Sequence, residues 1–128
     1  MTVLLDTHAL IWWLAGERAL SQRAAEIIGD EENRVLVSAA SAWEISTKVR
    51  IGKLPGCAYL ASNFSTILRD QELEPLDVTV EHACRAGALP GEHRDPFDRM
   101  LIAQAVALDV PIVSNEEVFD GFGVRRIW

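Results

Sequence analysis

Several features that would identify common protein classes are missing from this sequence. Its two cysteines, Cys57 and Cys84, lack the CxxC spacing of zinc and redox motifs, and its three histidines are scattered. No Walker A, GxGxxG or GxSxG loop is present, which argues against P-loop NTPases, dinucleotide enzymes and serine hydrolases. The longest apolar stretch, residues 9–15, is much shorter than the roughly 18 residues of a membrane span, and the N-terminus lacks the basic segment of a signal peptide. We therefore expect a cytoplasmic protein with no membrane attachment.

Positive charge is also scarce. Twelve Lys and Arg residues against nineteen Asp and Glu residues give a formal net charge of −7. Generic binding to polyanions is disfavoured, because phosphate contacts normally come from a surplus of Lys and Arg. A nucleic-acid enzyme whose own acids are masked by cations remains compatible with this charge. The 128 residues, 49% of them hydrophobic, suit one globular domain covering residues 1–128.

The hydrophobic pattern predicts strands that alternate with helices. We expect strands at residues 3–5, 34–37, 73–78, 111–114 and 124–127, and helices at residues 8–15, 21–28, 41–51, 59–69, 79–86 and 96–108, with a short helical turn at 116–119. This alternation is typical of an α/β fold with a mainly parallel sheet covered on both faces. In such sheets, ligands bind beyond the carboxyl ends of the strands.

Four carboxylates fall at junctions between the predicted strands and helices. Asp6 directly follows the first strand, and Glu44 lies in the helix after the second. Asp98 lies in the first turn of the helix at 96–108, and Glu116 follows the next strand by two residues. We therefore expect the four side chains to point into one cleft.

Each acid also has a purely structural interpretation. Ser41 and Glu44 have the spacing of a capping box, and Glu44 precedes Lys48 by four residues, a favourable helix pair. Asp95 is suited to cap the helix that begins at Pro96, where Asp98 would face the positive end of the helix dipole. Asp6 could likewise cap the first helix.

The joint pattern favours a metal site. Two carboxylates about 6 Å apart repel by roughly 3 kcal/mol at an effective dielectric constant near 20. Six such pairs would cost about 15 kcal/mol, which matches the whole stability of a typical domain. A cleft of this kind must hold protons or a cation, and all-oxygen ligands favour Mg²⁺ or Mn²⁺ over zinc.

Four short motifs contain these acids. They are LLDTH at 4–8, SAWEI at 41–45, DPFDR at 95–99 and VSNE at 113–116. Together and in this order they resemble the PIN-domain ribonuclease family, and within it the VapC toxins of type II toxin–antitoxin systems. The resemblance implies a three-layer α/β/α sandwich with a mainly parallel sheet and an acidic metal cleft.

The resemblance also implies the roles of the acids. Asp6, Glu44 and Asp98 match the three main acids of the family, as catalytic residues and as ligands of Mg²⁺ or Mn²⁺. Glu116 falls where many members carry Asp, and we predict it as the fourth such acid. Glu117 and Asp95 stay open as alternatives for that fourth position.

Substrate and partners follow from the same resemblance. It implies endonucleolytic cleavage of RNA, inhibition by a cognate antitoxin protein, and a homodimer. Arg99, Lys48 and Arg94 are candidate RNA contacts near the acids, although each could equally be a solvated surface charge or, for Lys48, a partner of Glu44. We expect His8 to pack rather than to take part in catalysis.

Two other classes of function stay open. A phosphoryl-transfer enzyme or signalling receiver could use Asp6 as its acceptor, although His8 occupies the place where phosphatases of the haloacid-dehalogenase type carry a second Asp, and no Lys follows Lys53. A non-catalytic binding module could keep the acids only as helix caps.

Overall fold

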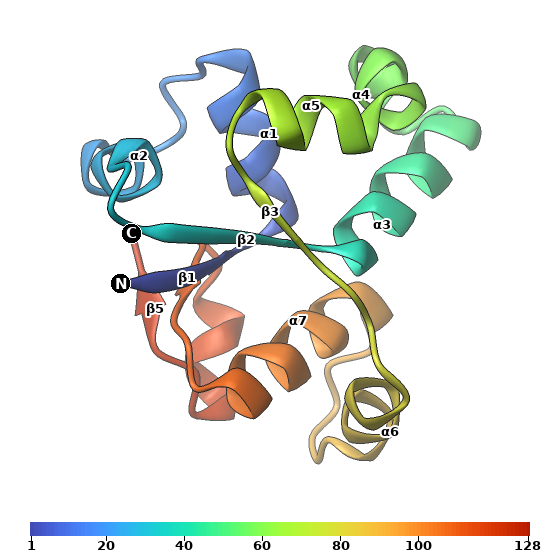
Figure 1. The fold of residues 1–128 in the computed structure, drawn as a ribbon. Helices are drawn as coiled ribbons and strands as arrows, with labels where there is room; N and C mark the ends of the chain where they lie inside the picture. The colour runs from blue at the N-terminus through green and yellow to red at the C-terminus, as the bar shows by residue number, and fades with distance from the viewer.

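A sheet of five short parallel strands forms the centre of the molecule (Figure 1). The computed structural model describes residues 1–128. Its strands are β1 (Thr2–Leu5), β2 (Arg34–Ser38), β3 (Glu74–Leu76), β4 (Ile112–Val113) and β5 (Arg126–Ile127). They lie in the order β3-β2-β1-β4-β5, and every neighbouring pair is parallel.

Helices cover both faces of this sheet (Figure 1). On one side lie α1 (Thr7–Ala15), α2 (Gln22–Gly29), α3 (Ala39–Arg50), the 3₁₀ helix η1 (Pro55–Cys57), α4 (Ala58–Ser62) and α5 (Phe64–Asp70). On the other lie α7 (Pro96–Leu108) and the 3₁₀ helix η2 (Glu117–Phe122), while α6 (Val80–Ala88) packs on α7. No helix is both long and apolar enough to cross a membrane.

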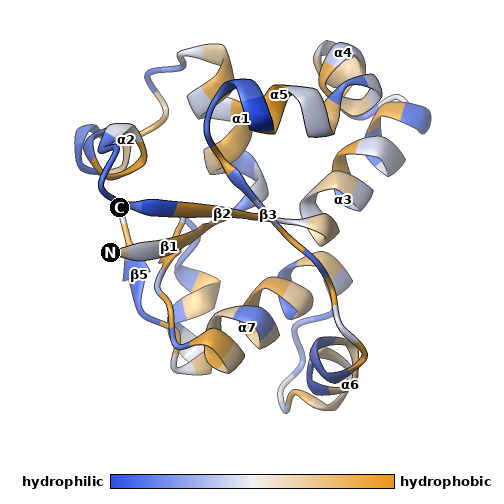
Figure 2. Ribbon diagram, in the orientation of Figure 1, coloured by the Kyte–Doolittle hydropathy of each residue, from blue (hydrophilic) through white to orange (hydrophobic).

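Alternating side chains in the strands build two separate cores. Val3 and Leu5 of β1 pack in the cluster under α1 to α5, whereas Leu4 between them packs with α7 on the opposite face. In Figure 2, β2 is hydrophobic beyond its charged first residue, as expected for a strand covered on both faces. The predicted three-layer α/β/α sandwich with a parallel sheet is confirmed.

Two helix predictions need correction. The helix after β2 begins at Ala39 and not at Ser41, because the Ser38 hydroxyl caps it by accepting from the Ala40 N–H. Ser41 is instead buried, with its hydroxyl 2.9 Å from that of Thr7. The predicted capping box of Ser41 and Glu44 is therefore wrong.

The helix predicted for residues 59–69 is also wrong in one respect, since it is two helices. Asn63 separates α4 from α5 with a non-helical backbone at φ −131° and ψ 29°. Its side-chain amide donates to the carbonyl of Tyr59 at 2.9 Å. An Asn side chain that bonds the nearby backbone in this way competes with a continuous helix.

The strand order places a crevice between β1 and β4. The chain extends the sheet from β1 through β2 to β3 in one direction and through β4 to β5 in the other. Connections therefore leave the carboxyl ends of β1 and β4 toward opposite faces, which opens a ligand-binding crevice at this point. Asp6 directly follows β1, and Ser114 directly follows β4.

The core under α7 makes a direct prediction about stability. Phe119 of η2 is fully buried in this core. We expect Phe119→Ala to lower the free energy of unfolding by about 3–5 kcal/mol, because it leaves a cavity among well-packed side chains. Val80→Ala is the control, since Val80 is 82% exposed and should change stability by less than about 0.5 kcal/mol. Urea denaturation followed by circular dichroism measures both, and equal stability of the two variants would contradict the packing described.

Candidate active site

Asp6 lies in the crevice between β1 and β4 and is almost fully buried, at 2% exposure. Its Oδ1 accepts from the N–H of Thr7 at 2.7 Å, so it caps α1 as predicted. Its Oδ2 accepts from the hydroxyl of Ser114 at 2.7 Å. Two donors from neighbouring strand ends therefore hold one carboxylate in a single orientation.

Glu116 and His8 approach Asp6 from the two sides of this crevice. One ligand atom from each of Asp6, His8 and Glu116 can be chosen so that all three lie within 4.8 Å of one another. His8 Nδ1 lies 3.6 Å from Glu116 Oε1. The hydroxyl of Ser114 also accepts from the backbone N–H of Glu116 at 2.9 Å, so one side chain bonds the Asp6 carboxylate and fixes the backbone of Glu116. His8, which we expected only to pack, is part of this cluster.

Asp98 enters the site from the first turn of α7. Asp95 caps that helix as predicted, because its Oδ1 accepts from the N–H groups of Phe97 and Asp98 at 2.9 and 3.2 Å. The carboxylate of Asp98 lies 2.9 Å from Nε2 of His93, on the loop before the helix. His93 was not among the predicted site residues, since a lone loop histidine carries no local signal of this contact.

Glu44 is buried on α3 and is paired with Lys48 one turn later. The predicted helix pair is thus confirmed. Burial by itself would lower the pKa of Lys48, but the hydrogen bond and charge of Glu44, with the charges of Asp95 and Asp98, raise it above its ordinary value. Lys48 therefore remains a cation that faces several of the acids.

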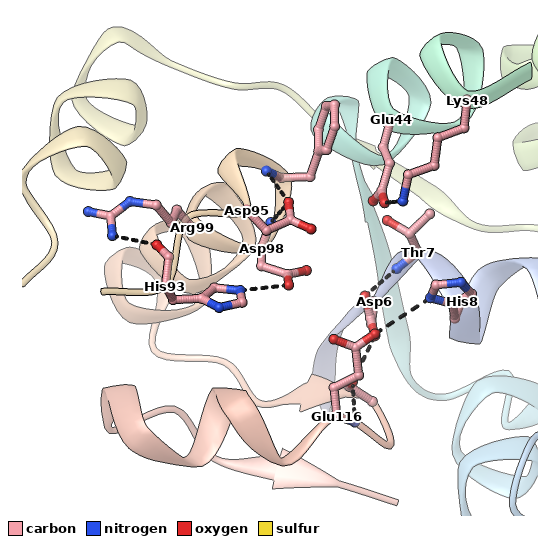
Figure 3. A network of polar contacts seen from close by, with 12 residues as sticks. Asp6, Thr7, His8, Glu44, Lys48, His93, Asp95, Asp98, Arg99 and Glu116 are labelled. Carbon is pink, nitrogen blue, oxygen red and sulfur yellow. Dashed lines mark hydrogen bonds and ion pairs between the residues drawn. The ribbon is translucent and has the colours of Figure 1, made fainter. Parts of the chain in front are cut away.

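The predicted acids surround one shared space (Figure 3). In this view the head groups of Asp6, Glu44, Asp98 and Glu116 point toward one another from four different segments. The charges of Glu116 and Asp98 raise the pKa of Asp6, and the charge of Glu116 raises the pKa of Asp98, whereas Glu44 is neutralised by Lys48. Their roles as ligands and catalytic groups stay predictions.

Burial changes the acid–base chemistry of two of these groups. It is the main cause that raises the pKa of Asp6 to about 7, and the charges of Glu116 and Asp98 raise it further against the opposing hydrogen bond from Ser114. Burial likewise raises the pKa of Asp98 to about 6, although the hydrogen bond with His93 opposes the shift. Crowded carboxylates without a cation hold protons at pH values where exposed ones are ionised.

Arg99 and Arg94, two of the three predicted RNA contacts, differ from each other in their surroundings. Arg99 donates to the backbone carbonyls of Ala86, Leu89 and His93 and so holds the loop between α6 and α7. Its position gives no support to the predicted RNA contact. Arg94 is exposed on the same loop and forms no ion pair, which leaves its predicted contact open.

The donor set fits a hard divalent cation. Asp6 and Glu116 offer carboxylate oxygens within 4.8 Å of each other and of His8, whereas Asp98 lies outside this group. Burial is the main cause of the raised pKa values of Asp6 and Asp98, and neighbouring carboxylates add to it. Oxygen donors suit Mg²⁺ and Mn²⁺. No cysteine takes part, which disfavours a structural zinc site.

Comparison with known proteins agrees with this architecture. The PIN domain family model matches residues 3–124. The chain therefore belongs to the PIN domain family.

Two curated relatives come from Mycobacterium tuberculosis. Ribonuclease VapC16 is 39% identical over 75 residues, which are 59% of this chain and 52% of that protein. Ribonuclease VapC22 is 28% identical over 106 residues, which are 82% of this chain and 79% of that protein. The chain thus spans about half the length of the first relative and about four fifths of the second.

Solved structures share the fold at low sequence identity. VapBC2 from Rickettsia felis, bound to a DNA fragment from its promoter, superimposes with a TM-score of 0.69 at 16% identity, covering 99% of this chain and 98% of that chain. A toxin–antitoxin complex from Klebsiella pneumoniae gives a TM-score of 0.60 at 18% identity, covering 90% and 87%. At these identities the likeness establishes the fold alone.

The raised pKa of Asp6 predicts how stability varies with pH. Unfolded Asp titrates near pH 4, whereas folded Asp6 titrates at about 7. Between these values the folded state binds more protons, so this group makes the free energy of unfolding fall as pH rises from about 4 to 7. Asp6→Asn removes the effect, and we expect it to stabilise the metal-free chain by about 2–4 kcal/mol at pH 8, with less gain toward pH 4.

Urea denaturation in EDTA at pH 5 and pH 8 measures this difference. Asp70→Asn is the matched control, because Asp70 is exposed at the end of α5 and forms no ion pair. A gain from Asp6→Asn that is the same at both pH values would contradict the burial of an ionisable Asp6.

The pair of Glu44 and Lys48 predicts a second stability effect. Lys48→Met leaves the Glu44 carboxylate, only 6% exposed, without its cation. We expect a loss of about 2–3 kcal/mol at pH 7.5, less than a fully buried pair would lose because Lys48 is partly exposed. The double variant Lys48→Met with Glu44→Gln should recover most of it. Equal stability of the single and double variants in urea denaturation would contradict the pairing.

Proposed function

We propose that this chain is a metal-dependent endoribonuclease that acts as the toxin of a toxin–antitoxin pair. Asp6, Glu44, Asp98 and Glu116 form its catalytic and metal-binding site. The observation that carries the proposal is the approach of Asp6 and Glu116 at the crevice between β1 and β4, with Asp98 and Glu44 pointing toward the same space (Figure 3). Membership of the PIN domain family supports it, as do two relatives that are named ribonucleases.

Asp6, Asp98 and Glu116 would hold the metal, and Glu44 would complete the acidic site. When bound, Mg²⁺ or Mn²⁺ would activate water and stabilise negative charge on the phosphate. Loading the site also removes the conflict between an acidic protein and an anionic substrate, because the cation reverses the local charge.

The surrounding residues of this chain position the acids. Ser114 and the backbone of Thr7 orient Asp6, and His93 orients Asp98. Such outer partners fix the direction in which a carboxylate presents its free lone pairs. Lys48 adds a cation beside the acids, at a place where it can attract a phosphate oxygen of the RNA.

A cognate antitoxin protein is the proposed regulator. A toxin–antitoxin complex from Klebsiella pneumoniae shares the fold over 90% of this chain. An antitoxin that covers the acidic crevice would block substrate and metal together. This regulation and the proposed homodimer can be tested by co-expression and by measuring molecular mass.

Loss of the acids should abolish cleavage. We expect the chain to cleave single-stranded RNA internally with Mg²⁺ or Mn²⁺, to stop in EDTA, and to lose at least about 100-fold in rate on Asp6→Asn or Asp98→Asn, because each removes a charged metal ligand. Electrophoresis of end-labelled RNA measures the cleavage.

Asp70→Asn is the control and should cleave at the rate of the unmodified chain. Thermal melting should confirm that every variant is folded. The site assignment fails if the double variant with both Asp6→Asn and Asp98→Asn retains metal-dependent cleavage.

A further inference from the structure

Trp43 on α3 is the largest hydrophobic side chain left exposed, at 61%. It immediately precedes Glu44, whose side chain turns inward toward the acidic site. A tryptophan at this position does not contribute fully to either core. Its exposed ring therefore lies on the solvent side of α3, next in sequence to one of the four acids.

A second aromatic ring braces Trp43. Phe97 in the first turn of α7 lies with its ring centre 4.8 Å from that of Trp43, at an interplanar angle of 74°. This edge-to-face arrangement is the favourable geometry for an aromatic pair. Phe97 immediately precedes Asp98, so the two rings come from the same two segments that supply Glu44 and Asp98 to the site. The indole is thus held in place and still has area open to solvent.

The exposed face of α3 that carries Trp43 also carries positive charge, nearer the C-terminal end of the helix. We call this face the exposed stripe of α3. Trp43, Ser46 and Arg50 are exposed and recur at the spacing of one helix face. Lys53 follows on the exposed turn after the helix. Neither Arg50 nor Lys53 forms an ion pair within the chain. Both cations are therefore available in a protein whose net charge is −7.

The residue types of this stripe favour one kind of binding partner. The buried core of an interface between protein subunits is more apolar than the rest of the surface, but the exposed face of α3 continues from Trp43 into Ser46 and Arg50. An aromatic ring followed by cations is the arrangement by which proteins bind single-stranded nucleic acid without reading its sequence. The ring stacks on a base, and the cations accompany the backbone.

We propose that this stripe of α3 is a binding surface for single-stranded RNA, in which one nucleobase stacks on Trp43 and the adjoining phosphates are neutralised by Arg50 and Lys53. The inference rests on the proposed function, because it takes RNA as the molecule that reaches the acids. It deepens that function by naming the first contact that the RNA strand makes outside the carboxylate site.

Binding of a fluorescently labelled single-stranded RNA, followed by anisotropy, tests the proposal. All variants are made in the Asp6→Asn background in EDTA, so that the RNA stays intact. We expect Trp43→Ala to weaken binding by about tenfold and Trp43→Phe to retain most of the affinity, because an aromatic face still stacks. Arg50→Ala should reduce the slope of log affinity against log salt by about 1, the change expected when one phosphate contact is lost.

Two further measurements separate stacking from a general loss of structure. Replacing single nucleotides by abasic ones should weaken binding at one position, and at that position Trp43→Ala should have no additional effect. RNA should quench the tryptophan fluorescence of the parent chain, and Trp43→Phe should lose this quenching while binding persists. Tyr59→Ala is the matched control, because Tyr59 is a 74% exposed aromatic on α4 that lies beside Ile11 and Leu14 of α1.

The outcomes distinguish this inference from the proposed function. Equal RNA affinity of Trp43→Ala and Tyr59→Ala overturns the inference, even if the unmodified chain cleaves RNA. If Trp43→Ala changes the molecular mass in solution but leaves RNA affinity unchanged, the ring belongs to a protein interface and the inference is overturned. Failure of the parent chain to bind RNA also overturns the inference. Binding that depends on Trp43, in an unmodified chain that never cleaves RNA with Mg²⁺ or Mn²⁺, supports the inference and refutes the proposed function.

Discussion

The rest of this molecule depends on one constraint, the burial of carboxylates at one edge of a parallel sheet. Asp6 lies at the end of β1 at 2% exposure, and Asp98 and Glu116 are near enough to perturb it. Such crowding opposes folding, because burial and like charges both disfavour ionised carboxylates. A fold that retains this arrangement has to compensate it with protons, hydrogen bonds, an internal cation or a bound metal.

The chain supplies the first three of these compensations itself. Protons remain on Asp6 and Asp98 up to pH values of about 7 and 6. Hydrogen bonds from Ser114 and Thr7 fix Asp6, and Lys48 neutralises Glu44. These partial measures leave a crevice that is rigid, acidic and only partly neutralised. In the proposed ribonuclease, a divalent cation would complete the compensation, so we expect metal binding to stabilise the fold.

Much of the fold was predictable because it follows from local pattern. The apolar run of β1 and the proline and acidic cap at the start of α7 each act within a few residues, and the helix at 96–108 was predicted with the bounds found in the structure. Predicted helix bounds were wrong where side chains compete to hydrogen-bond backbone groups. Ser38 and Ser41 are both suitable caps, and only the end of β2 decides between them. Asn63 interrupts a helix whose hydrophobic spacing continues across it.

The sequence by itself determined that acids would stand at junctions between strands and helices, because strand ends and helix starts are set by neighbouring residues. Only the tertiary structure decided which side chains serve those acids. Ser114 reaches Asp6 across 108 positions of the chain, His93 turns toward Asp98, and Arg99 turns away to hold the loop carbonyls. Burial, and with it the pKa of Asp6, likewise depends on every element that excludes water from the crevice. These are long-range properties, and no local spacing of residues encodes them.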